Sequence, residues 1–262
     1  MRVPSVLLAL LCAGLLPACA TLPPGERDAR DPFEGFNRSM YRFNDTLDRA
    51  VARPVAQTYV NVTPQPVRSG VSNFFRNINS ARTIVNSALQ AKPRLFFTET
   101  ARLVINTTIG IGGLFDPAAQ MGLQAGDEDF GQTLGRWGVP AGPYLVLPVL
   151  GPATVRDTVG VGVDQFTDPK YYLVQKTWVK FGATLASLID RRAELLGADL
   201  VLERAYDPYV FMRNAYLQQR EYEVMDGEVP SQADEFEIFE FDDEEMDTPD
   251  DAPAPVQEPP VQ

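Results

Sequence analysis

Residues 31–51 read DPFEGFNRSMYRFNDTLDRAV and predict the first helix of the chain. The large apolar residues of this stretch recur three or four positions apart, at Phe33, Phe36, Met40, Phe43, Leu47 and Val51. Because an α-helix turns once in about 3.6 residues, this spacing places them on one face of an amphipathic helix. Asp31 and Pro32 are typical of a helix start, with Glu34 reaching back to Asp31 as in a capping box. Pro54 is expected to end the helix.

Further helices are predicted along the chain from the same apolar spacing. We expect them after Pro66, at 82–90, at 93–105, at 170–196 and at 200–219, the last with a start or kink at Asp207-Pro208. Residues 130–152 are instead rich in Gly and Pro, which permit sharp turns and deny this segment a regular helix. Neither an alternation of strands and helices nor a fixed-period repeat is visible. The fold class is therefore mainly α, built from short amphipathic helices.

The apolar stripes of these helices have two interpretations. In a soluble protein such stripes form the core. In an exported, lipid-anchored protein the same stripes face acyl chains at the membrane interface. The pattern alone does not distinguish the two, and no apolar run reaches the ~18 residues of a transmembrane helix.

The first residues resemble the export signal of a bacterial lipoprotein. An apolar run from Val3 to Leu16 is too short to span a bilayer and is typical of a signal peptide. It leads into Leu-Pro-Ala-Cys at 16–19, which makes Cys19 the expected lipidated residue. Three acyl chains on Cys19 give effectively permanent anchoring, and Ala20 after it favours the outer membrane. The alternative is ordinary secretion with cleavage near Ala20.

The net charge of −12 is unevenly distributed. Residues 221–262 hold 16 acids and neither Lys nor Arg, which leaves 19 acids against 23 bases for residues 1–220. This acidic, Pro-rich tail is predicted to be disordered. Residues 236–241 within it, which alternate apolar and acidic side chains, are either a solvated, partly apolar patch or a short motif that docks a basic partner. The predicted layout is a signal peptide at 1–18, a polar tether at 19–30, a helical domain at 31–220 and the tail at 221–262.

Several kinds of catalytic site are excluded by composition. The chain has no histidine, so Ser-His-Asp and Cys-His catalysis and His-ligated zinc or haem are impossible. Residues 109–114 carry a glycine cluster without the Gly-Lys-Ser/Thr ending of a phosphate loop, and residues 127–129 lack the ligand spacing of a calcium loop. We therefore predict no enzyme, no cofactor and no metal. The body's bases are mostly Arg, which suits lipid phosphates and nucleic acids equally well.

Six segments, taken together and in order, resemble one known family. They are 31–44 (DPFEGFNRSMYRFN), 67–75 (VRSGVSNFF), 106–117 (NTTIGIGGLFDP), 129–135 (DFGQTLG), 142–148 (GPYLVLP) and 151–157 (GPATVRD). They lie within the predicted helical domain 31–220 and are similar to the VacJ/MlaA family of outer-membrane lipoproteins of Gram-negative bacteria.

The resemblance implies a ring-like assembly of helices in the inner leaflet of the outer membrane, with a Gly/Pro-rich hairpin and an amphipathic channel. Mislocalised phospholipids of the outer leaflet would pass through this channel to a soluble periplasmic lipid carrier, which maintains outer-membrane lipid asymmetry. Trimeric porins are the other implied partners, and no nucleic acid or ATP is implied. The alternative is a structural lipoprotein that braces porins or the cell envelope without moving lipid.

The resemblance also implies candidate channel or gate residues. The segment Gly138-Val-Pro-Ala-Gly142 resembles a hinged hairpin that gates the channel, with Pro140 at a place where glycine is common. Phe43 and Asn44 occupy a place on the first helix that resembles a gating region.

Overall fold

The computed structural model describes residues 28–168 and 176–227. Cys19, the predicted signal peptide, most of the tether and the tail from residue 228 onward therefore lie outside the described residues. All described elements belong to one unit of the chain, Met1–Gly227.

The first predicted helix does not end at Pro54. Helix α2 (Glu34–Leu47) leads into a π-helical turn, η1 (Asp48–Ala52), which leads directly into α3 (Arg53–Val62). The backbone stays in the right-handed helical region at both junctions. The wider π-helical turn just before Pro54 explains the continuity, because it gives room for the proline ring, which otherwise clashes with the carbonyl four residues earlier.

The predicted pair of helices around residue 82 is a single helix. Helix α4 (Gln65–Leu89) starts after Pro64 and runs without interruption through the predicted start at residue 82. Helix α5 (Pro93–Thr108) returns along it, and the short α6 (Pro117–Gln120) is capped by the Asp116 carboxylate, which accepts a hydrogen bond from the backbone N–H of Ala119.

The Gly/Pro-rich segment 130–152 begins with a short helix, so the expectation that it holds no regular helix was wrong, and the hairpin lies later in the chain than expected. After α7 (Phe130–Arg136), strand β1 (Tyr144–Leu147) pairs antiparallel with β2 (Gly151–Thr154), and Tyr144 lies opposite Thr154. Helix α8 (Val155–Thr167) follows directly.

The last elements differ in their bounds from the prediction, except that the predicted start at residue 170 lies outside the described residues. They are α10 (Thr177–Glu194), η2 (Leu195–Ala198), α11 (Asp199–Arg204) and α12 (Pro208–Val224). The predicted start at Asp207-Pro208 is confirmed, because Asp207 accepts hydrogen bonds from the first N–H groups of α12. This helix passes the predicted tail boundary at Arg220 and ends at Val224.

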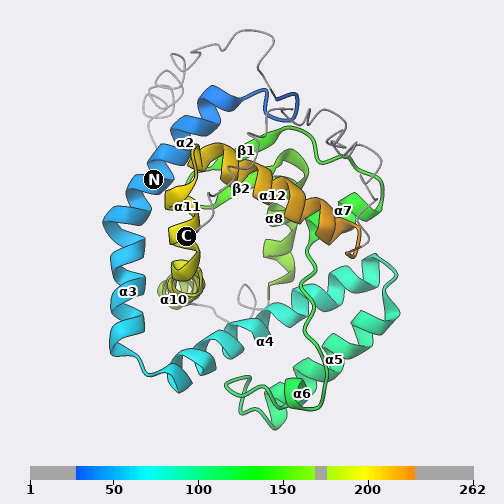
Figure 1. The fold of residues 1–262 in the computed structure, drawn as a ribbon. Helices are drawn as coiled ribbons and strands as arrows, with labels where there is room; N and C mark the ends of the chain where they lie inside the picture. The colour runs from blue at the N-terminus through cyan, green and yellow to red at the C-terminus, as the bar shows by residue number, and fades with distance from the viewer. Residues whose placement is uncertain (1–27, 169–175, 228–262) are drawn as a thin grey trace, which may run out of the picture. The chain divides into compact units, whose positions relative to one another are not determined.

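The contacts between elements close in a circuit (Figure 1). Helix α3 packs on α10, α10 on α4, and α4 on α7 and α8. Helix α8 contacts β2, and β1 contacts α2, which continues into α3. Helix α12 joins the circuit from within by contacting both α7 and β2. The mainly helical class is confirmed, and none of the described helices is long and apolar enough to cross a membrane.

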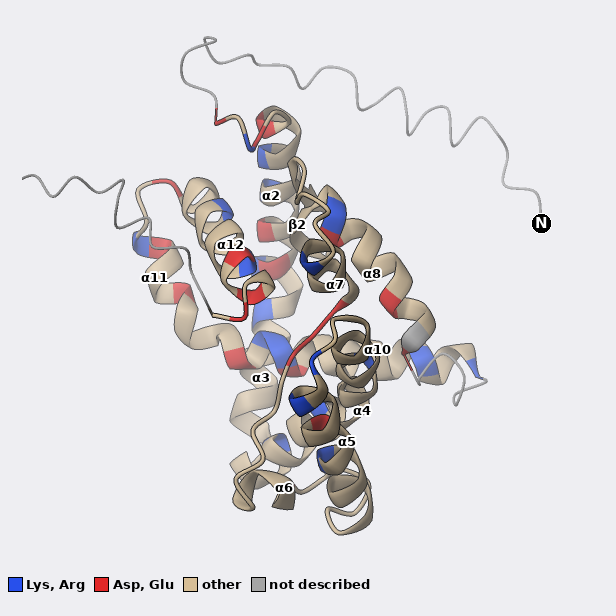
Figure 2. Cartoon of the chain, turned by 90° about the vertical axis from the view of Figure 1, so that its right-hand side faces the viewer, with Lys and Arg blue, Asp and Glu red and all other residues tan. Residues whose placement is uncertain are grey.

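Burial in the described part of the chain is dominated by polar residues. The buried apolar side chains are few: Ala56, Ala118, Tyr144, Val146, Ala153 and Tyr209. The buried ionisable residues are more numerous: Asp31, Glu99, Arg102, Glu128, Arg156, Asp157, Asp164, Asp190, Arg213 and Arg220, besides the tyrosines. Figure 2 shows acidic and basic residues close together along α12, whereas α6 carries none. The interior is therefore held by hydrogen bonds and ion pairs more than by apolar packing.

Candidate functional site

The large apolar residues lie mainly on the exterior of the described elements. Phe33, Phe43 and Val51 of the first stripe are 49%, 50% and 52% exposed. Other stripes show the same pattern, with the following exposed residues: Phe97, Val104, Ile109, Ile111, Phe115, Trp178, Phe181, Leu185 and Leu188. Soluble monomers rarely expose so much contiguous apolar surface. Of the two interpretations left open by the sequence, the core is therefore wrong for these residues, and contact with lipid is favoured.

A buried cluster around Arg220 joins three helices. The Arg220 guanidinium contacts Asp129 at the start of α7 at 2.6 Å and Asp157 of α8 at 3.1 Å. The Tyr216 hydroxyl donates to Asp157 at 2.7 Å. Burial opposes ionisation of both carboxyls, yet the pKa of Asp129 and that of Asp157 are lowered, because Arg220 holds their charged forms.

A second buried cluster lies at Asp31, which does not cap α2 as predicted. The helix begins at Glu34, with Phe33 at the N-cap, and the Glu34 carboxylate accepts a hydrogen bond from Arg38 instead. Asp31 accepts hydrogen bonds from the Tyr209 hydroxyl and from Arg213 of α12. This aspartate therefore ties the first described helix to the last.

Two asparagines of α2 form hydrogen bonds with the backbone of strand β1 and of the turn after it, along the edge that does not pair with β2. Asn37 donates to the carbonyl of Tyr144 and accepts from the N–H of Val146, both at 2.9 Å. Asn44 donates to the carbonyl of Leu147 at 2.9 Å and accepts from the N–H of Val149 at 2.8 Å. Seven residues of helix rise about 10.5 Å and three residues of strand about 10 Å, so the two amides meet matching positions of the strand. We call Asn37 and Asn44 the amide clamp.

The structure separates the predicted gate residues into two groups. Gly138 and Gly142 have φ angles of +90° and +70° in the link between α7 and β1, with Pro140 exposed between them. This link is not itself the hairpin; it enters the hairpin at the open end, where a Cβ on Gly142 would lie 3.3 Å from Val155. Asn44 holds the opposite end, at the turn, and the neighbouring Phe43 is half exposed. The hairpin lies between the two groups.

Sequence reasoning missed Asn37 and did not reveal the hydrogen bonds of Asn44 to the hairpin. A clue was present, since two asparagines seven residues apart lie on one face of a helix. Their partners lie over 100 positions away, so the pattern did not reveal what they bind. In the described ranges, the acidic residues form no group of three or more arranged to hold a metal ion.

We expect Asn44→Ala to loosen the hairpin turn without unfolding the protein. The change removes two hydrogen bonds, each contributing about 0.5–1.5 kcal/mol, from a turn in which Val149 has a φ of +67°, unfavourable for a β-branched residue. Hydrogen exchange at the amide of Val149 should accelerate by roughly tenfold or more. The exposed Asn79→Ala is the control, and unchanged protection at Val149 would contradict the clamp.

The comparisons with known proteins agree with this geometry. Residues 29–223 match the model of the family described as MlaA lipoprotein. The chain belongs to the MlaA lipoprotein family. Family membership confirms the sequence resemblance and covers nearly all the residues that the structure describes.

Two members of the MlaA family illustrate the similarity. The "Intermembrane phospholipid transport system lipoprotein MlaA" of Escherichia coli (strain K12) is 39% identical over 223 residues, or 83% of this chain and 88% of that protein. The protein of the same name from Haemophilus influenzae is 36% identical over 239 residues, or 87% and 94%.

A solved structure shares the MlaA fold. The structure, described as "Structural basis for maintenance of bacterial outer membrane lipid asymmetry", has a TM-score of 0.68 and 37% identity to this chain. The match covers 76% of this chain and 100% of that one. These MlaA relatives are transport lipoproteins and not enzymes, in agreement with the sequence prediction.

Proposed function

We propose that this chain is an outer-membrane lipoprotein that removes mislocalised phospholipids from the outer leaflet and passes them to a periplasmic carrier. Its transport maintains the lipid asymmetry of the outer membrane. The names of the relatives from Escherichia coli and Haemophilus influenzae, and the subject of the solved structure, support this function.

The proposal rests on the burial pattern of the described residues, which expose many large apolar side chains and bury many charged ones. Apolar side chains such as Phe97, Trp178 and Phe181 are 68%, 72% and 64% exposed, whereas charged groups such as Asp31 and Arg220 are buried. Such a molecule buries its exterior in acyl chains and satisfies its polar groups internally, as a lipid environment requires. A phospholipid needs both environments, with its tails in lipid and its head group along a polar path.

The anchor and the partners form the finer part of the proposal. Cys19 carries the acyl chains that attach the protein to the periplasmic face of the outer membrane. A trimeric porin supports the helices in the membrane, and a soluble lipid carrier receives the lipid. The route needs no nucleotide, because lipid moves downhill to the carrier.

The gate belongs to the same proposal. The hairpin 144–154 is held at its turn by the amide clamp and enters through a link with two glycines at positive φ. Phe43, Asn44, Gly138, Pro140 and Gly142 thus lie at the two ends of one movable element, and motion of this hairpin opens and closes the lipid path.

We expect the lipidated protein, reconstituted with its porin in vesicles, to transfer a labelled phospholipid to purified carrier without nucleotide. A matched vesicle with porin alone should give only the spontaneous rate. Cells lacking the gene should accumulate phospholipid in the outer leaflet. A protein that binds porin but yields the spontaneous rate, in cells with normal asymmetry, is the structural lipoprotein of the alternative and contradicts transport.

A further inference from the structure

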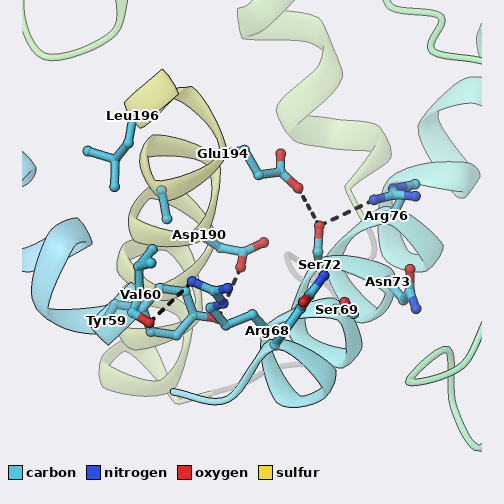
Figure 3. Close-up of a pocket in the computed structure, with 12 residues that line it drawn as sticks. Tyr59, Val60, Arg68, Ser69, Ser72, Asn73, Arg76, Asp190, Glu194 and Leu196 are labelled. Carbon is cyan, nitrogen blue, oxygen red and sulfur yellow. Dashed lines mark hydrogen bonds between the residues drawn. The ribbon is translucent and has the colours of Figure 1, made fainter. Parts of the chain in front are cut away.

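A cavity with several charged side chains in its wall lies between helices α3, α4 and α10 (Figure 3). Its volume is about 400 Å³, within the ~300–1,000 Å³ range of small-molecule sites. Helix α4 contributes Arg68, Ser72 and Arg76 to the wall, and α10 contributes Asp190 and Glu194. Helix α4 therefore supplies the bases of the cavity and α10 the acids, and the Arg68 side chain reaches toward Asp190 (Figure 3).

The two arginines keep most of their hydrogen-bonding capacity. Arg68 donates to the backbone carbonyl of Val60 at 3.2 Å, and Arg76 donates to the Ser72 hydroxyl at 3.3 Å. Among the residues that the structure describes, neither forms an ion pair with a carboxylate, although most other arginines of the interior do. Because a guanidinium has five N–H donors, each can still bind an anion.

The two carboxylates likewise contact neutral partners. Asp190 is 7% exposed and accepts a hydrogen bond from the Tyr59 hydroxyl at 3.1 Å. Glu194 accepts one from the Ser72 hydroxyl at 2.6 Å. Burial raises the pKa of Asp190 above its usual value, and burial next to Asp190 raises the pKa of Tyr59 to about 12. A buried carboxylate without a bound cation gains from one that enters the cavity.

We propose that this cavity binds the zwitterionic head group of a phosphoethanolamine lipid, with the phosphate at Arg68 and Arg76 and the ammonium at Asp190 and Glu194. The inference rests on the proposed function and adds a head-group preference to it. A phosphate with a primary ammonium a few ångströms away matches a cavity in which bases from α4 and acids from α10 lie close together without pairing with one another.

The chemistry of the cavity predicts an order of affinity among lipid head groups. A primary ammonium donates charge-assisted hydrogen bonds to carboxylates, whereas the quaternary ammonium of choline has no N–H to donate. A phosphoglycerol head group has no cation and leaves both carboxylates unpaired, which is costly for a buried acid. Phosphoethanolamine should therefore bind most tightly and phosphoglycerol least.

The test is equilibrium binding of short-chain dihexanoyl lipids to the whole protein in detergent. We expect phosphatidylethanolamine to bind about tenfold or more tightly than phosphatidylglycerol. Glu194→Gln should remove this preference, and Arg76→Gln should weaken binding of both lipids by about tenfold. Both positions are exposed helix residues, so these variants should fold, and the exposed Glu221→Gln on α12 is the matched control that keeps the preference.

Two further measurements separate a lipid site from a site for a soluble phosphate compound, and separate failure of the head-group site from failure of the proposed function. Free phosphoethanolamine should bind more weakly than the lipid; equal binding would assign the cavity to a soluble phosphate compound and overturn the inference. Lipid transfer to the carrier is measured on the same protein. Transfer without any head-group preference would overturn the head-group site alone, whereas a preference without transfer would overturn the proposed function.

Discussion

Replacing Arg220 with leucine should lower the free energy of unfolding by about 3–5 kcal/mol, the usual cost of leaving a buried charge without its partner. The guanidinium is 8% exposed and contacts Asp129 and Asp157 at 2.6 and 3.1 Å. Leucine fills part of the space but leaves Asp129 without its guanidinium partner and leaves the buried Asp157 with Arg156 alone. Arg220 therefore helps to hold α12 against α7 and α8.

Urea unfolding of the protein in detergent measures this loss. The control is Arg136→Leu, whose exposed pair with Asp226 should contribute only about 0–1 kcal/mol. The pH dependence gives a second readout. Because the pKa values of Asp129 and Asp157 are lowered in the folded state, their stabilisation is present above the ordinary value of 3.8 and is lost as pH falls through the folded values. The difference between wild type and Arg220→Leu should therefore narrow in acid, and a constant difference would contradict the cluster.

Gly160→Ala should destabilise the protein by about 3 kcal/mol, the upper end of the usual cost of overpacking. Helices α7 and α8 meet at this glycine, and a Cβ there would lie 2.5 Å from the backbone nitrogen of Gly131. A backbone atom of a packed helix has no side-chain freedom with which to move aside, so the two helices must separate.

Two residues later the same substitution should act in the opposite direction. A Cβ at Gly162 meets nothing within 4 Å, so Gly162→Ala should stabilise the helix by about 0.5–1 kcal/mol through its better helix propensity. Both variants are compared by thermal unfolding in detergent. Equal effects at the two positions would show that propensity, and not the contact with Gly131, determines the result.

The helices were predictable from the sequence because apolar spacing reports helix faces. The same spacing gave no information about what each face touches, and this is why Phe43 and Val51 lie outside whereas a core was the usual expectation. The prediction that the first helix ends at Pro54 was wrong because the effect of a proline on a helix depends on the backbone just before it. The π-helical turn that precedes Pro54 is not visible in the sequence pattern.

The candidate site was less predictable, because its contacts join distant parts of the chain. Asp31 was read from its neighbours as a helix cap, but its partners are Tyr209 and Arg213, over 170 positions away. The cavity beside Asp190 likewise depends on two helices that the sequence does not show to be neighbours. Roles for Cys19 and for the link 138–142 remain predictions.

The pairing of Asp31 with α12 has a consequence for how the chain folds. The buried cluster at Asp31 forms only when the segment near residue 31 meets helix α12 near residue 210, so these contacts wait for almost the whole polypeptide to emerge. Contacts of such long sequence separation form slowly, because the loop entropy is lost before the contact energy is gained. Until that moment the apolar stripes are exposed, while charged residues such as Asp31 and Arg213 still lack the partners that they have in the folded protein. Synthesis of this protein therefore passes through an aggregation-prone stage whose length is set by the arrival of its last helix.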